Sequence, residues 1–159
     1  MSLADLFKLP SHVSKRCRFN THVFENEFAR ADLHFFGVDH ATYSYNLHVF
    51  LNNEDADLNS DRTIENGYAG VVPVFGHGGC YGGSGHCCVK HMSRAGDRRR
   101  DHPLVKAFKR LTITETLRHV LSGKKTFKVT IVPEITGGSS RCDAVPAKYF
   151  DRVTVVTYD

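Results

Sequence analysis

The sequence contains no apolar run that approaches the roughly 20 consecutive residues needed to cross a bilayer, so we expect no membrane-spanning protein. Its first residues, MSLADLFKLP, lack the basic flank, apolar core and small-residue cleavage site of a signal peptide. This favours a cytoplasmic location, although a mature secreted fragment would have the same features. Internal repeats, a low-complexity tail and alternating strands and helices are also absent, which argues against a parallel α/β fold.

Several signatures of catalytic and metal-binding proteins are missing too. No serine lies in the sharp strand-to-helix setting of a nucleophile elbow, and the paired CxxC motifs of a zinc ribbon are absent. We therefore expect neither a hydrolase of that type nor a zinc ribbon. The number of cysteines is odd, at five, so a monomer keeps at least one unpaired thiol and the redox compartment stays open.

The composition that remains is typical of one soluble globular domain. The 159 residues are 41% hydrophobic and 24% charged, which is sufficient for a buried core, and we expect a single domain over residues 1–159. The formal net charge is +4, and much of the excess lies in SRAGDRRRDH (93–102). Because Asp97 and Asp101 flank these arginines and no aromatic series accompanies them, we expect a solvated loop and no nucleic-acid partner.

Alternation of apolar and polar residues predicts several β-strands. In YSYNLHVFLN (43–52), one face carries Tyr45, Leu47, Val49 and Leu51. His48 lies on the other face, where the pattern allows either solvent exposure or a second packed layer. Pro133 should end the strand TFKVTIVPEI or place it at a sheet edge. Further strands are predicted in CRFNTHVFEN (17–26), DLHFFGV (32–38), GVVPVFG (70–76) and RVTVVTYD (152–159).

One helix and one long loop complete the prediction. The helix lies in TITETLRHVLSG (112–123), with Thr112 or Thr114 as its N-cap and Gly123 at its end. NNEDADLNSDRTIENG (52–67) is acidic and rich in asparagine, which is typical of a surface loop. Strands joined by loops, with one short helix, predict an all-β fold: an antiparallel β-sandwich or a jelly roll.

Four short sequence motifs, in a fixed order along the chain, carry a family resemblance. YNLHVFLNN, YAGVVPVFGH, LTITETLRHVL and KTFKVTIVPEI are followed by the closing VTVVTYD. In this order they resemble the "vfvN" strand, "yAGsf" strand, "iTelL" helix and "vTlVP" strand of the C-terminal domain of polyphenol oxidases and related tyrosinases. That domain is also similar to the last domain of arthropod hemocyanins. The resemblance covers roughly residues 43–159, and we expect it to extend to the two opening strands.

The resemblance implies a β-sandwich that, in longer relatives, packs against a helical domain holding two copper ions and shields its entrance. The copper ligands of that helical domain are histidines on a four-helix bundle. This sequence has no histidines at helical spacing on such a scaffold. The phenol oxidation of the family is therefore not expected of this chain alone.

The stretch FGHGGCYGGSGHCCVKH (75–91) departs from the plant-type pattern, which has no cysteines in this loop. It gathers three cysteines, three histidines and six glycines in seventeen residues. Thiolate and imidazole are good ligands for copper(I) and zinc, and the glycines allow a tight backbone path. We therefore predict that His77, Cys80, His86 and Cys87 bind one metal ion. The resemblance favours copper over zinc.

Two other interpretations of this segment stay open. A disulfide from Cys80 to Cys87 or Cys88 would close a short ring and stabilise it by about 2–3 kcal/mol in an oxidising compartment. Alternatively, the thiols are buried without a ligand. His34, His40, His48, His91 and His102 are histidines that the fold could bring near the loop. Cys17 and Cys142, near the first and last strands, could pair if the protein is secreted.

These features support three hypotheses for function. The first is an accessory domain that binds copper through the Cys/His loop and shields, or supplies copper to, a tyrosinase-like copper catalytic domain. Thiolates favour transfer of copper(I) over turnover in air, which would oxidise them. The second is a small stand-alone copper-dependent oxidase or oxygenase. The third is a structural interaction domain with a disulfide-pinned loop.

Overall fold

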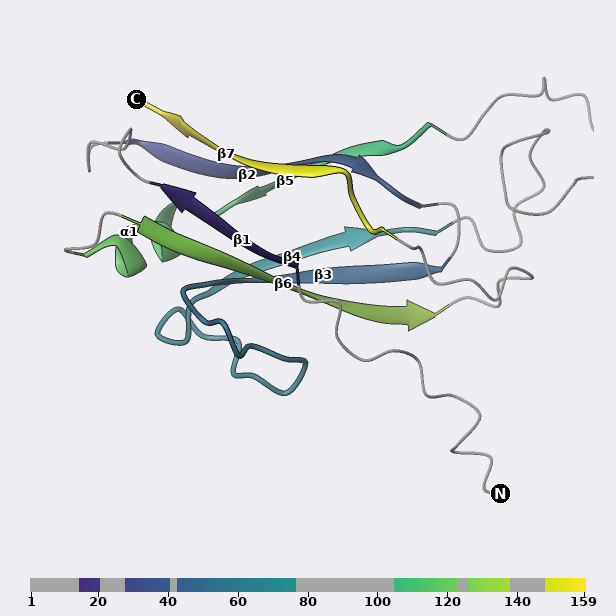
Figure 1. Cartoon of the computed structure of the whole chain (residues 1–159), viewed down its shortest axis with the longest axis horizontal. Helices are drawn as coiled ribbons and strands as arrows, with labels where there is room; N and C mark the ends of the chain where they lie inside the picture. The colour runs from purple at the N-terminus through teal and green to yellow at the C-terminus, as the bar shows by residue number, and fades with distance from the viewer. Residues whose placement is uncertain (1–14, 21–27, 41–42, 77–104, 123–125, 138–147) are drawn as a thin grey trace, which may run out of the picture.

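The computed structural model describes residues 15–20, 28–40, 43–76, 105–122, 126–137 and 148–159. These residues form two antiparallel sheets that face each other, with one short helix at one end (Figure 1). The strands of the first sheet follow the order β1 (Lys15–Asn20), β6 (Thr126–Gly137), β3 (Ser44–Leu51), β4 (Tyr68–Val74). Those of the second follow the order β5 (Ala107–Thr112), β2 (Arg30–Val38), β7 (Arg152–Tyr158), and the helix is α1 (Thr114–Leu121). The predicted all-β antiparallel sandwich is confirmed.

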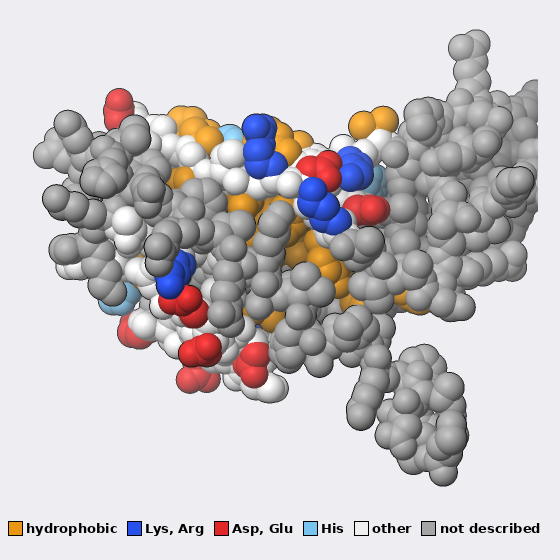
Figure 2. All heavy atoms as spheres, in the orientation of Figure 1, with side chains coloured by type: hydrophobic (Ala, Val, Ile, Leu, Met, Phe, Trp, Pro, Cys, Tyr) orange, Lys and Arg blue, Asp and Glu red, His pale blue; other side chains and the backbone are white. Residues whose placement is uncertain are grey.

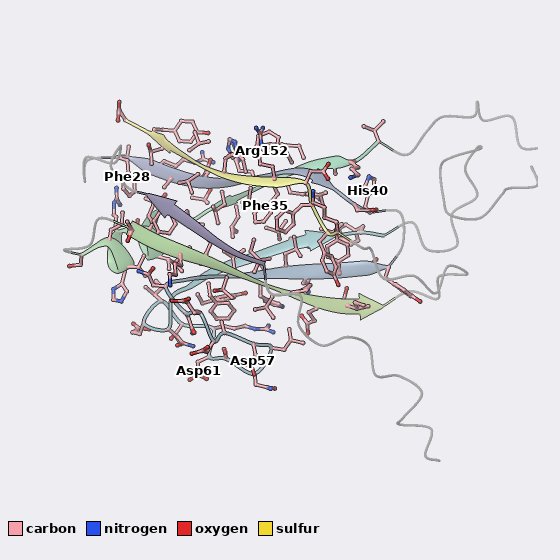
Figure 3. The ribbon with its side chains drawn as sticks, viewed as in Figure 1. Phe28, Phe35, His40, Asp57, Asp61 and Arg152 are labelled. Carbon is pink, nitrogen blue, oxygen red and sulfur yellow. The ribbon has the colours of Figure 1, made fainter. Side chains whose placement is uncertain are left out.

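The core lies between the two sheets and follows the period of two that the sequence shows. Leu47 and Val49 of β3 and Leu33 and Phe35 of β2 are completely buried. The ring of Phe35 meets that of Phe150 edge to face, with 5.4 Å between centroids, and Figure 3 shows Phe35 between the sheets. Alternation places every second side chain on the same side of a strand, so the inward rows of both sheets meet in a single core.

The connection 52–67 covers the outer face of the four-stranded sheet. Phe50 and Val132 point outward from β3 and β6, yet they are 1% and 2% exposed because Ala56 of this connection and Tyr68 pack on them. Gly67 ends the connection at φ +79°, a conformation that glycine adopts readily. A Cβ at Gly67 would lie 2.0 Å from the carbonyl oxygen of Leu51, so no larger residue fits there without a backbone shift.

The structure corrects two predictions about element ends. The helix begins after Ile113 and has no side-chain cap; Thr114 accepts a hydrogen bond from the Ala31 amide (3.0 Å) instead. The predicted Thr112 or Thr114 cap is therefore wrong. Pro133 does not end β6, which continues to Gly137. Among the described residues, the pairing of β6 with β1 extends only to Ile131, and Pro133 is paired with Leu47 of β3 alone, as the sheet-edge alternative predicts.

One further difference concerns the strands. Residues 107–112 form β5, which the sequence analysis did not predict, and this strand pairs with β2 along residues 32–38. The first strand, β1, lies at an edge of the four-stranded sheet, and the last, β7, lies at an edge of the three-stranded sheet. The pairing of Cys17 with Cys142 is not tested, because Cys142 lies outside the described residues. Among the described helices, none is long and apolar enough to cross a membrane.

Candidate functional site

The segment 77–104, which contains the Cys/His loop, joins the two sheets at one end of the sandwich. It follows β4 of the four-stranded sheet and precedes β5 of the three-stranded sheet, so it is a crossover between sheets rather than a hairpin within one. On the departing side, the amide of Gly76 donates a hydrogen bond to the hydroxyl of Ser44, at 3.0 Å. Phe75 beside it is 78% exposed. The start of the segment is therefore tied to the first residue of β3.

The returning side of the segment is held by contacts from two other connections. Nε2 of His40 lies 2.8 Å from the carbonyl oxygen of Val105. Because a carbonyl can only accept, Nε2 carries the hydrogen in this contact. Nζ of Lys106 contacts both carboxylate oxygens of Asp151, at 3.0 and 3.1 Å. The hydrogen bond from Lys106, followed by that from Lys148, holds the pKa of Asp151 below its ordinary value despite an opposing desolvation effect.

A buried tyrosine links the connections that surround this end. The hydroxyl of Tyr45 lies within hydrogen-bonding reach of the carbonyl oxygens of Asp39 and Tyr149. Burial is the main cause that raises the pKa of Tyr45 above its ordinary value, so the hydroxyl keeps its hydrogen and remains a donor. The ring packs edge to face on that of Tyr149, with 4.9 Å between centroids. Tyr45 therefore fixes the β2–β3 connection against the chain that leads into β7.

The predicted metal ligands His77, Cys80, His86 and Cys87 lie outside the described residues, as do His91 and His102. Of the other histidines considered, only His40 lies at this end of the sandwich. His34 is in the middle of β2, on the outer face of its sheet, and His48 is in the middle of β3. Within the described ranges, no group of three or more His, Cys, Asp or Glu side chains could hold a metal ion. A site with three or more such ligands would therefore include donors from outside the described residues.

A second polar cluster lies beneath the acidic connection, and the sequence analysis did not identify it. His48 is 3% exposed, so the second packed layer is the correct alternative for its face of β3. Its Nε2 lies 2.7 Å from a carboxylate oxygen of Glu134, and its Nδ1 lies 3.2 Å from the hydroxyl of Tyr68. The hydrogen bond with His48 is the largest cause that lowers the pKa of Glu134, and Asn46 contributes a weaker one. The cluster joins β3, β4 and β6 under the loop.

A surface cavity of about 530 Å³ lies at the opposite end of the sandwich from segment 77–104. Its lining combines amides and carboxylates with one imidazole, and includes Asn52, Asn53, Glu54, Asp55, Glu65 and His119. Asn52 adopts φ +56° and is fixed by its own side chain, which accepts a hydrogen bond from the Lys128 amide at 2.9 Å. This hydrogen bond accounts for the positive φ of Asn52, so no ligand is needed to explain it.

The fold and its crossover define the chain as a small antiparallel β-sandwich with a Cys/His-rich connection between its sheets. Solved structures of a polyphenol oxidase are similar to it. Latent aurone synthase (polyphenol oxidase) from its natural source matches 91% of this chain with 24% of its own, at a TM-score of 0.52 and 16% identity. The recombinantly expressed enzyme matches 97% of this chain with 26% of its own, at a TM-score of 0.53 and 14% identity. The same enzyme co-crystallised with hexatungstotellurate(VI) matches 97% of this chain with 26% of its own, at a TM-score of 0.52 and 15% identity.

These similarities concern the fold. The chain spans about a quarter of the length of the polyphenol oxidase structures that it matches. The β-sandwich that the sequence resemblance implies is confirmed by them. No protein-family model matches the sequence, and a search of curated proteins gives no match.

Proposed function

We propose that this chain is an accessory domain of a tyrosinase-like copper protein, and that it binds copper, or zinc as the alternative metal, through its Cys/His loop. In this role it shields, or supplies copper to, a catalytic partner. One observation carries the proposal: nearly the whole chain has the fold of one quarter of a polyphenol oxidase. The remaining three quarters of that enzyme have no counterpart in this sequence.

The contacts around segment 77–104 support the placement of a metal-binding loop. Ser44, His40 and Lys106 hold the residues on both sides of it, so the loop starts and ends on a fixed frame. A fixed frame lowers the conformational entropy lost when the loop closes on an ion. The donors His77, Cys80, His86 and Cys87 suit a soft ion such as copper(I).

The donor set also favours transfer of copper over oxidation chemistry. When copper(I) is bound, it would be held by the thiolates and imidazoles of this chain and could pass to a histidine site of higher affinity. Cysteine ligands oxidise during turnover with oxygen, which argues against a stand-alone oxidase. The shielding function needs only that the sandwich covers the entrance of a partner.

The experiment is metal analysis of protein purified without chelator, followed by titration of free thiols. We expect about one equivalent of copper or zinc and thiols protected from the reagent. Cys80→Ser/His86→Ala should lose the metal without unfolding the sandwich, and its unfolding curve should match that of metal-free wild type. Cys88→Ser/His91→Ala, which changes neighbouring residues of the same types, is the matched control and should keep the metal.

The other outcomes separate the competing functions. Absence of metal together with few free thiols would support a disulfide-pinned loop, and metal uptake by the double variant would refute the ligand assignment. Oxygen consumption with catechol by the copper-loaded chain alone would support an oxidase. Restoration of activity in a copper-free tyrosinase-like catalytic protein, only by the copper-loaded chain, would support transfer.

A further inference from the structure

The outer face of the three-stranded sheet presents aromatic and arginine side chains that the described residues leave exposed or half-buried. We call this surface the aromatic–arginine face; it comprises Arg30, His34, Phe36, Phe108, Arg110, Arg152 and Tyr158. Phe108 is 53% exposed and Tyr158 is 40% exposed. Figure 3 shows Arg152 on the outer side of the sheet, away from Phe35 in the core.

The aromatic side chains form a packed cluster rather than isolated groups. The ring centroids of Phe36 and Phe108 are 5.2 Å apart, and those of His34 and Phe108 are also 5.2 Å apart, nearly perpendicular. The guanidinium carbon of Arg152 lies 4.5 Å from the centroid of Phe36. Side chains held by such contacts lose little freedom on binding, which is typical of interface anchors.

The charges on this face are predominantly positive. Asp32, fully buried beneath Arg30 and Arg110, is the carboxylate in the middle of the cluster. Three arginines (Arg30, Arg110 and Arg152) and one carboxylate give a net charge of +2, as three positive minus one negative. The exposed Asp159 follows β7. A partner surface that carries carboxylates around an apolar patch would match this arrangement.

The two sheets differ in how the described chain covers their outer faces. On the four-stranded sheet the connection 52–67 reduces the exposure of Phe50 to 1%. This connection includes five acidic residues, and Figure 2 shows carboxylates gathered along its side of the molecule (lower side in the view). No described segment gives Phe108 a comparable cover. Binding hot spots are enriched in tyrosine and arginine. The aromatic–arginine face combines these residue types with a central apolar group.

We propose that the aromatic–arginine face docks on an acidic surface of the tyrosinase-like copper protein, a proposal that rests on the function given above. The occupant is a protein surface of opposite charge with apolar residues at its centre. The fold occurs within a chain about four times longer, which supplies a large body for such a contact. A second copy is disfavoured face to face, because both surfaces would be positive.

The test compares two double variants in binding to the tyrosinase-like copper protein of the same genome, measured by calorimetry at low and high salt. Phe108→Ala/Arg152→Glu removes an exposed ring and reverses one charge on the face. Leu58→Ala/Arg62→Glu makes the matched changes on the opposite side, where both residues are exposed. We expect the face variant to bind at least about tenfold more weakly and the control to bind within about twofold of wild type. Copper uptake should be unchanged in both.

Each outcome supports or overturns the proposal. If wild type binds and the face variant binds equally well, the docking face is wrong and the accessory function stands. If wild type does not bind the copper protein, the accessory function fails and the docking proposal with it. Self-association in sedimentation, or binding of a single-stranded oligonucleotide, that is lost in the face variant would assign the face to another occupant. Thermal unfolding of both variants at the wild-type temperature excludes misfolding as the cause.

Discussion

Replacement of Glu134 by alanine tests the buried polar cluster under the acidic connection. The carboxylate accepts the hydrogen bond from Nε2 of His48 at 2.7 Å, and His48 is only 3% exposed. Without Glu134 the buried Nε2–H loses its acceptor, which costs about 1–3 kcal/mol. The side chain of Glu134 is 35% exposed, so water can replace part of the bond and we expect about 1–1.5 kcal/mol. The melting temperature should fall by roughly 2–6 °C.

The pH dependence gives a second measure of the same contact. The folded-state pKa of Glu134 is lower than its ordinary value of 4.5, mainly because of the hydrogen bond with His48. A lowered folded-state pKa means that the ionised group stabilises the fold above the unfolded pKa, and that this stability is lost as the pH falls through the folded pKa. The difference in stability between wild type and the variant should therefore be constant near neutral pH and shrink below about pH 4.5.

Urea unfolding followed by circular dichroism between about pH 3 and pH 7 measures both effects. Glu65→Ala, which removes an exposed carboxylate of the same connection, is the control and should change stability by less than about 0.5 kcal/mol. A Glu134→Ala curve that runs parallel to wild type at every pH would refute the pKa argument. A loss no larger than that of the control would refute the role of the contact.

Three further changes test the packing and the connections. Phe35→Ala, at a fully buried site between the sheets, should lower the free energy of unfolding by about 3–5 kcal/mol in denaturant titration. Gly67→Ala should cost at least about 1–3 kcal/mol, since it forces a positive φ and a clash with the Leu51 carbonyl; a neutral result would contradict the local backbone. Tyr45→Phe leaves the Asp39 and Tyr149 carbonyls without this donor, and we expect a loss of about 1–2 kcal/mol in thermal unfolding, with faster hydrogen exchange around residues 39–40.

The strands that the sequence predicted are those whose alternation is itself strong. β3 and β6 place apolar residues at every second position, and burial of that face against the opposite sheet decides their conformation. β5 was missed because Phe108, Arg110 and Thr112 face outward and its inward positions include Lys109, so its pattern is weak. Pairing with β2, a tertiary interaction, makes this segment a strand.

The His48–Glu134 contact could not have been predicted from the sequence for a different reason. The two residues are 86 positions apart and meet only because β3 and β6 pair in one particular register, with His48 opposite Val132. A shift of one residue would turn His48 toward the core. In contrast, the four sequence motifs that resemble those of polyphenol oxidases predicted the fold, because they mark local strand and helix patterns in a fixed order. The Cys/His ligand set stays a prediction.

The two proposals place metal binding and docking on different parts of one scaffold. Segment 77–104 leaves β4 and returns into β5, and β5 is also the strand that carries Phe108 and Arg110 of the aromatic–arginine face. A partner that covers this face would therefore lie next to the point where the Cys/His segment rejoins the sheet at Val105 and Lys106. The proposed copper transfer requires the donor loop and the acceptor site to approach each other, and docking on β5 would bring the partner next to the end of this segment. If docking and transfer are coupled, Phe108→Ala/Arg152→Glu should still bind copper but no longer transfer it. Normal transfer by that variant would show that transfer does not depend on this face.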